Sequence, residues 1–241
     1  MIPGKSHFSI GRSIGQYRPL TRLLPLTVLT TLQIILLFSS KMARPIYASE
    51  APQPGTQQNA LQRILSTKVI QGFIPPEEGA PEETTTAGSR REMWCDGDRA
   101  PMRSLMPAQN YGLTFAETPT IFMAIPQTTA PRALLVIQNE AGDHNEEMIL
   151  PIPDADEHGV VSFQFPNDNP LEMGQNYRWS LAIMCQGYLD PSDPFFSGWV
   201  QRMERSPEIA QVLNSLSEAE QIEWFSQNGY WYDMLSLMLQ N

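Results

Sequence analysis

The sequence predicts a mainly β fold, an antiparallel immunoglobulin-like sandwich followed by a helical tail of two to three helices. Three observations lead to this prediction. Short apolar runs with strand-like spacing fill residues 94–205. The chain carries 21 Pro and 15 Gly, which favours many turns over long helices. Helix-start signals occur in the last part of the chain, from Ser206 onward. With 241 residues, of which 41% are hydrophobic, the chain can bury one core and still carry extensions.

Seven or so short strands are expected. Some apolar runs are continuous and bounded by proline, whereas others alternate apolar and polar residues, the period that places one set of side chains on a buried face. The runs of strand length are 121–125, 133–137, 148–152, 161–165, 177–185 and 195–203. Turn-forming residues lie between them at 139–145, 154–159 and 167–174. This regular spacing is typical of a sandwich.

The tail from residue 206 to 241 reads as helices. Ser206 and Pro207 form a helix start, with Ser as the N-cap and Pro in the first turn. Residues 217–220 match a capping box, which begins a second helix, and Asn228-Gly229 ends it. Residues 230–239 are largely apolar. They predict a third helix that packs on the sandwich, on the preceding helix or on a partner.

The first 48 residues read as a secretion signal. Six basic residues and no acidic one occur before Glu50, and residues 23–38 form an apolar run. Ala48 is the small residue after which cleavage is expected. The alternative is an uncleaved membrane anchor, although 16 apolar residues are short for the ~20 that a bilayer requires. Under both interpretations the rest of the chain crosses the membrane, so a periplasmic or secreted location is expected.

Residues 49–93 are rich in Pro, Glu and Thr and predict a flexible tether before the sandwich domain. From residue 49 onward the chain holds ten basic and all 26 acidic residues, a net charge of −16. Such a chain repels phosphate backbones, so nucleic-acid binding is not expected. Anionic membrane surfaces are disfavoured for the same reason, and a membrane contact is expected only if the N-terminal segment stays uncleaved.

Cys95 and Cys185 are the two cysteines of the chain. In an oxidising compartment paired thiols persist as disulfides, so a Cys95–Cys185 bridge is expected. The alternative is two separate buried thiols. A zinc site is less favoured, because two further ligands would have to come from His144 and His158 in turn segments.

Motifs for nucleophilic, nucleotide-dependent or zinc-dependent catalysis are missing from the sequence, so no catalytic residue is assigned and an enzyme is not favoured. Asp154, Asp156 and Glu157 cluster before Gly159. Hard oxygen ligands of this kind suit calcium, and the alternative is a plain turn. No other cofactor is expected.

Four aromatic residues crowd the tail: Trp224, Tyr230, Trp231 and Tyr232. They could form a binding surface for a sugar or a peptide. The alternative is that they pack into the core, because aromatics at helical spacing more often do so.

Several motifs together resemble a known family. They are residues 111–120 (YGLTFAETPT), 171–179 (LEMGQNYRW), 198–202 (GWVQR) and 228–233 (NGYWYD). With Pro75-Pro76, residues 86–90 and both cysteines, the chain from about Gly72 to its end is similar to the cyanobacterial domain-of-unknown-function family numbered 928. One departure is a Thr- and Glu-rich stretch where that family commonly has Gly. The resemblance implies a cyanobacterial, exported protein and supplies no activity.

The expected function is therefore a non-catalytic exported domain that binds another protein of the cell envelope or a secreted one. The alternative is a carbohydrate-binding module or weak glycan hydrolase that uses surface aromatics and acidic loops.

Overall fold

The computed structural model describes residues 62–63, 66–81, 94–95, 101–125, 128–156 and 158–239. The predicted signal segment, residues 1–48, lies outside the described residues. Within the described part of the chain, no helix is long and apolar enough to cross a membrane.

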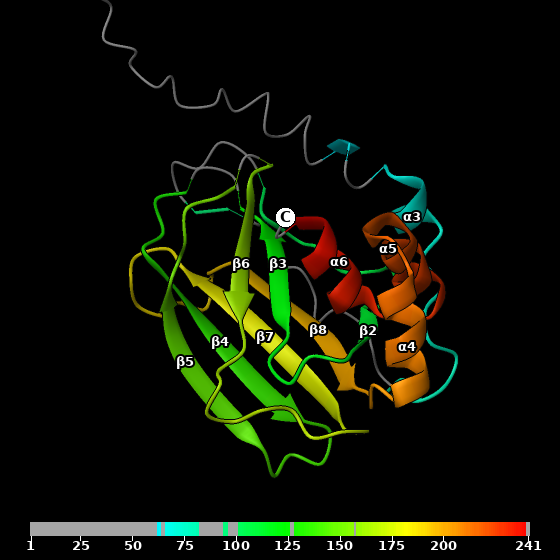
Figure 1. The fold of residues 1–241 in the computed structure, drawn as a ribbon. Coiled ribbons are helices and arrows are strands. Elements are labelled where there is room, and N and C mark those ends of the chain that lie inside the picture. The colour runs from blue at the N-terminus through cyan, green and yellow to red at the C-terminus, as the bar shows by residue number, and fades with distance from the viewer. Residues whose placement is uncertain are drawn as a thin grey trace, which may run out of the picture. The chain divides into compact units, whose positions relative to one another are not determined.

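In the part of the chain that the structure describes, eight strands form two sheets, which face each other in Figure 1. The larger sheet has the order β2 (Tyr111–Thr114), β8 (Phe195–Arg202), β7 (Asn176–Met184), β4 (Arg132–Asn139) and β5 (Asn145–Pro151). The smaller sheet has the order β1 (Arg103–Ser104), β3 (Thr120–Ala124) and β6 (Val160–Gln164). The mainly β sandwich that the sequence predicts is confirmed.

The core lies between the two sheets. Every second residue of β4 and β7 points inward, so Leu135 and Leu181 are fully buried opposite each other. Trp179 is buried on the same face of β7. The short strands β3 and β6 contribute Met123 and Phe163 from the other side. These apolar side chains are the alternating and continuous runs seen in the sequence.

One strand pair departs from the predicted antiparallel arrangement. β2 pairs with β8 in parallel, with Tyr111 opposite Trp199 and Thr114 opposite Arg202. The other strand pairs are antiparallel. β2 follows β1 of the smaller sheet and is not joined to β8 by a hairpin, so its direction is not constrained by a tight turn.

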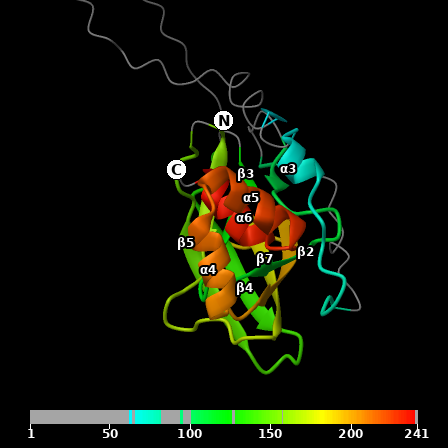
Figure 2. The same cartoon turned by 45° about the vertical axis from the view of Figure 1, so that its right-hand side comes forward.

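The helical tail forms as predicted, with α4 (Pro207–Ser215), α5 (Glu218–Gln227) and α6 (Trp231–Leu239). The Ser206 hydroxyl accepts a hydrogen bond from the Ile209 amide at 3.3 Å, which caps α4. The Ser217 amide donates to the Glu220 carboxylate at 2.8 Å, which completes the capping box of α5. Figure 2 shows the three helices gathered on one side of the sandwich.

Helix α6 and the turn before it cover the outer edge of β2. The Leu113 amide donates to the Gly229 carbonyl at 2.9 Å. The Phe115 amide donates to the Asp233 carboxylate at 3.1 and 3.3 Å. The approach is close, because a Cβ added at Gly112 would lie 2.5 Å from the Cβ of Trp231. This edge of the larger sheet therefore bonds to the tail instead of to another strand.

Residues 66–81, which include the short helix α3 (Lys68–Gln71), also pack on the tail. The Ser226 hydroxyl donates to the Val69 carbonyl at 2.7 Å, and the Ile74 amide donates to the Ser226 carbonyl at 2.9 Å. The rings of Phe73 and Trp231 meet edge to face at 4.8 Å. This stretch differs from the predicted tether, because its apolar residues find a surface to pack on.

Candidate functional site

The disulfide between Cys95 and Cys185 confirms the predicted bridge. Its sulfurs are 2.02 Å apart, and the Cα atoms are 5.4 Å apart. Cys185 directly follows β7, and Cys95 precedes the smaller sheet, so the bond joins the start of the sandwich to the end of a central strand. The alternative of two separate thiols does not hold.

The loop that follows Cys185 and leads into β8 is held by two aspartates. The Asp193 side chain is 6% exposed, and its carboxylate accepts hydrogen bonds from the Cys185 amide at 3.2 Å and the Asp190 amide at 2.8 Å. Asp190 accepts from the hydroxyl and the amide of Ser192. The hydrogen bond from the Ser192 hydroxyl, and to a lesser extent that from its amide, holds the pKa of the Asp190 carboxyl below its usual range. The loop is thus internally bonded along its length.

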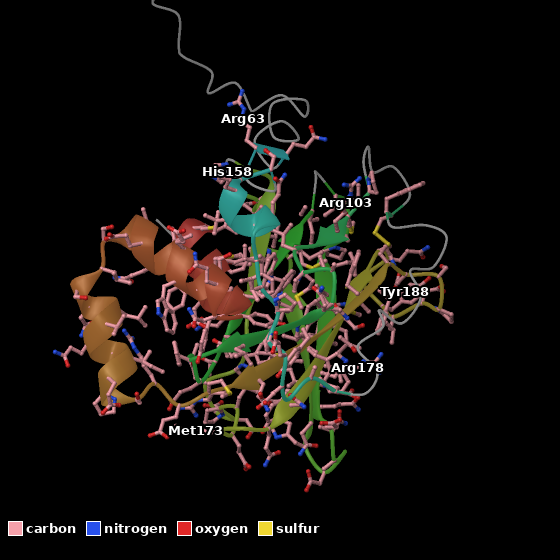
Figure 3. The ribbon with its side chains drawn as sticks, turned by 90° about the vertical axis from the view of Figure 1, so that its right-hand side faces the viewer. Arg63, Arg103, His158, Met173, Arg178 and Tyr188 are labelled. Carbon is pink, nitrogen blue, oxygen red and sulfur yellow. A yellow bond between two sulfur atoms is a disulfide. The ribbon has the colours of Figure 1, made fainter. Side chains whose placement is uncertain are left out.

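This bonded loop presents two large apolar side chains to solvent. Tyr188 is 56% exposed and Leu189 is 55% exposed. They follow Gly187, whose φ of 80° is the left-handed conformation that glycine allows. The Arg132 guanidinium donates to the Gly187 carbonyl, which ties the loop to the first residue of β4. Figure 3 shows Tyr188 at the periphery of the molecule.

A third exposed apolar residue is joined to the start of this loop through the disulfide. Trp94 is 43% exposed and precedes the bonded Cys95. Because consecutive Cα atoms are about 3.8 Å apart, the Cα of Trp94 is within about 9 Å of that of Cys185. We call Trp94, Tyr188 and Leu189 the tip surface. Exposed aromatic and aliphatic groups on a fixed backbone suit binding.

The acidic cluster before Gly159 is arranged as a turn. Asp156 accepts hydrogen bonds from the His158 amide at 2.8 Å and from the Val160 amide at 2.7 Å, and the side chain of Asp154 is exposed. Glu157 lies outside the described residues. Among the residues that the structure describes, no three His, Cys, Asp or Glu side chains are grouped so that they could hold a metal ion. The calcium site stays a prediction.

The tail aromatics are placed mainly in the core. Trp231 and Tyr232 are buried, and their polar atoms bond inward, from the Trp231 indole to the Leu105 carbonyl at 2.9 Å and from the Tyr232 hydroxyl to the Trp199 carbonyl at 3.0 Å. Tyr230 is buried and stacks on Phe115 at 4.0 Å. Trp224 is half-buried. This arrangement matches the packing alternative, and it does not offer these rings as an open platform.

Burial raises the pKa of the Asp233 carboxyl to about 6. Hydrogen bonds from the Phe115 amide and the Thr114 hydroxyl act in the opposite direction. Raised carboxyl pKa values often occur at functional sites. Here the partners of Asp233 belong to the end of β2, so the carboxylate ties α6 to the sheet.

Sequence reasoning missed the tip surface. Tyr188 and Leu189 lie between Gly187 and Asp190-Pro191, a segment typical of a turn. Large apolar residues inside such a segment have no buried face to occupy, and this was the available signal. The sequence places Trp94 near these two residues only if the Cys95–Cys185 disulfide is assumed.

The comparisons with known proteins bear on the family and add no activity. A family model described as "Domain of Unknown Function (DUF928)" matches residues 85–241. A search of curated proteins found no match.

Among solved structures, the chain is similar to the fn3 domain of the human collagen alpha-1(XX) chain. The two are 13% identical, with a TM-score of 0.29, over 45% of this chain and 87% of that domain. The two sheets themselves define the sandwich.

Proposed function

The chain belongs to the DUF928 family, and from that premise we propose that it is an exported, non-catalytic module that binds another protein of the cell envelope. The tip surface is the observation that carries this proposal. The disulfide supports export, because such bonds persist in the periplasm and outside the cell.

The composition of the tip surface supports protein binding. Tyr and Trp are enriched among the residues that dominate interface energies, because they bury a large area with few rotatable bonds. The hydrogen bonds of Asp190 and Asp193 fix the loop before any partner arrives. A fixed loop loses little conformational entropy on binding, which favours affinity.

The test is capture of partners from envelope extract with the whole tagged chain. The double variant Tyr188→Ser/Leu189→Ser removes both exposed side chains while leaving Asp190, Asp193 and the disulfide in place. We expect it to lose capture of the partner by about tenfold or more. The matched control is Val212→Ser on α4, where a 46% exposed apolar side chain lies away from the loop in sequence.

Equal capture by the double variant and the wild type, with both chains folded, would overturn the proposal. Circular dichroism and the thermal midpoint report folding. A catalytic turnover that survives the double variant would also contradict it.

A carbohydrate partner is the second candidate, because Trp94 and Tyr188 offer two exposed aromatic rings on which a sugar face can stack. A binding screen against envelope polysaccharides separates the candidates. A polysaccharide that binds the wild type and is lost with Trp94→Ala supports the carbohydrate. Capture of a protein partner that Tyr188→Ser/Leu189→Ser abolishes supports the module proposed above.

A further inference from the structure

The two edge strands of the larger sheet differ in whether their outer side is hydrogen-bonded. The β2 edge is bonded to Gly229 and Asp233 of the tail. β5, at the other end of the strand order, pairs with β4, and no described strand pairs with its outer side. Figure 1 shows β5 on the side of the molecule away from α4 and α5. An edge strand of this kind presents unpaired backbone groups.

The register shows which backbone groups of β5 point outward. At one end of the β4–β5 pair the Asn139 amide donates to the His144 carbonyl, and at the other the Ile152 amide donates to the Pro131 carbonyl. In an antiparallel pair the bonded positions alternate. Asn145, Glu147 and Ile149 therefore direct their amide and carbonyl groups away from β4. Pro151 follows them and has a carbonyl alone to offer.

An aliphatic side chain accompanies these backbone groups. Ile149 is 54% exposed on the outer face of the sheet. It lies opposite Leu134 of β4, which is half-buried, and the neighbouring Val136 is half-buried too. A strand added beside β5 would cover Ile149 with its own side chain on that face.

The charge of this edge specifies what kind of strand fits. Residues 140–157 include seven acidic residues and no Lys or Arg. Glu147 is exposed beside Ile149, on the outer face. Glu146 points to the inner face, and its Oε2 is buried with no hydrogen-bond partner among the described residues. A second copy of β5 would bring acid against acid, so pairing with itself is disfavoured.

We propose that β5 is a strand-addition site that takes an extended segment of a partner protein, with basic side chains opposite Glu146 and Glu147 and an aliphatic one beside Ile149. Main-chain hydrogen bonds to Glu147 and Ile149 supply the pairing, and the two carboxylates supply the selectivity. This mode deepens the proposed function, since Arg132 lies opposite Pro151 and also donates to the Gly187 carbonyl, which places the end of β5 beside the loop that carries Tyr188 and Leu189.

The test uses a synthetic peptide, acetyl-Thr-Val-Val-Lys-Arg-Thr-amide, titrated into the whole chain and followed by NMR. We expect the amide protons of Glu147 and Ile149 to gain protection from hydrogen exchange. Those of Met148 and Leu150 face β4 and should change little. The same peptide with Glu in place of Lys and Arg is the control for charge, and we expect it not to bind.

Two variants of β5 isolate the backbone contribution. Ile149→Pro removes one outward amide while leaving the bonds to β4, and we expect binding at least about threefold weaker. Ile149→Val keeps the amide and should bind as the wild type does.

If the basic peptide binds without protecting Glu147 and Ile149, or binds Ile149→Pro as well as Ile149→Val, strand addition is wrong. These measurements leave Tyr188 and Leu189 unchanged, so such a result would refute strand addition and would not affect capture through the tip surface. The two proposals can therefore be refuted independently.

Discussion

The protonation state of the Asp233 carboxyl affects the stability of the fold. Its pKa in the fold is about 6, above the ordinary value of 3.8, so the folded protein favours the protonated form. The stabilisation from this group is present at low pH and is lost as the pH rises through about 6. This direction is opposite to that of a carboxylate held in an ion pair.

The prediction compares the wild type with Asp233→Asn, which keeps an oxygen acceptor for the Phe115 amide and cannot ionise. Between pH 4.5 and pH 7.5 the free energy of unfolding of the wild type should fall by about 1–2 kcal/mol relative to the variant. Denaturant unfolding at several pH values measures this difference. Other titrating groups are shared and cancel, so a constant difference between the two proteins would contradict the assigned role of Asp233.

At the scale of elements, the contact between β2 and α6 depends on the absence of one side chain. A methyl group at Gly112 would meet the Cβ of Trp231, which is fixed to the helix backbone and cannot rotate away. We therefore expect Gly112→Ala to destabilise the protein by about 1–3 kcal/mol, because α6 must move. Chemical denaturation measures the change, and an unaltered midpoint would show that α6 is not held as described.

The same elements show what the sequence could and could not predict. β4, β6, β7 and β8 follow an apolar pattern, and Ser206 and Ser217 mark helix starts, so these elements were predicted close to their bounds. β2 carries Gly112 and Thr114, whose burial comes from α6 and not from an alternating pattern. Val69 and Phe73 were assigned to a tether, because their packing surface is formed by residues more than 150 positions later.

The candidate site was predictable only in part. Two cysteines in a chain that is expected to be exported predict the disulfide, because each is the other's one possible cysteine partner. The exposure of Tyr188 depends on the hydrogen bonds of Asp193, and the openness of β5 depends on which strand ends the sheet. Both are properties of the assembled fold, and neither leaves a local pattern in the sequence.

At the scale of the whole molecule, the Cys95–Cys185 bond closes a loop of 90 residues. In the chain-entropy model such a closure stabilises the folded state by about 4 kcal/mol. We expect Cys95→Ser/Cys185→Ser to lose about this much free energy of unfolding, measured by denaturant titration. The wild type in reductant should match the double variant, and reductant should not affect the variant itself. A loss below about 1 kcal/mol would mean that the bond constrains little.

The covering of β2 by the tail also sets an order of events during synthesis. The groups that complete this edge, Gly229 and Asp233, follow all the described strands in the chain and are therefore synthesised after them. A nascent chain that contains the eight described strands but not residues 229–233 still lacks the groups that cover the β2 edge of the larger sheet. The edge of the larger sheet at β2 therefore cannot be covered during synthesis until residue 233 has emerged.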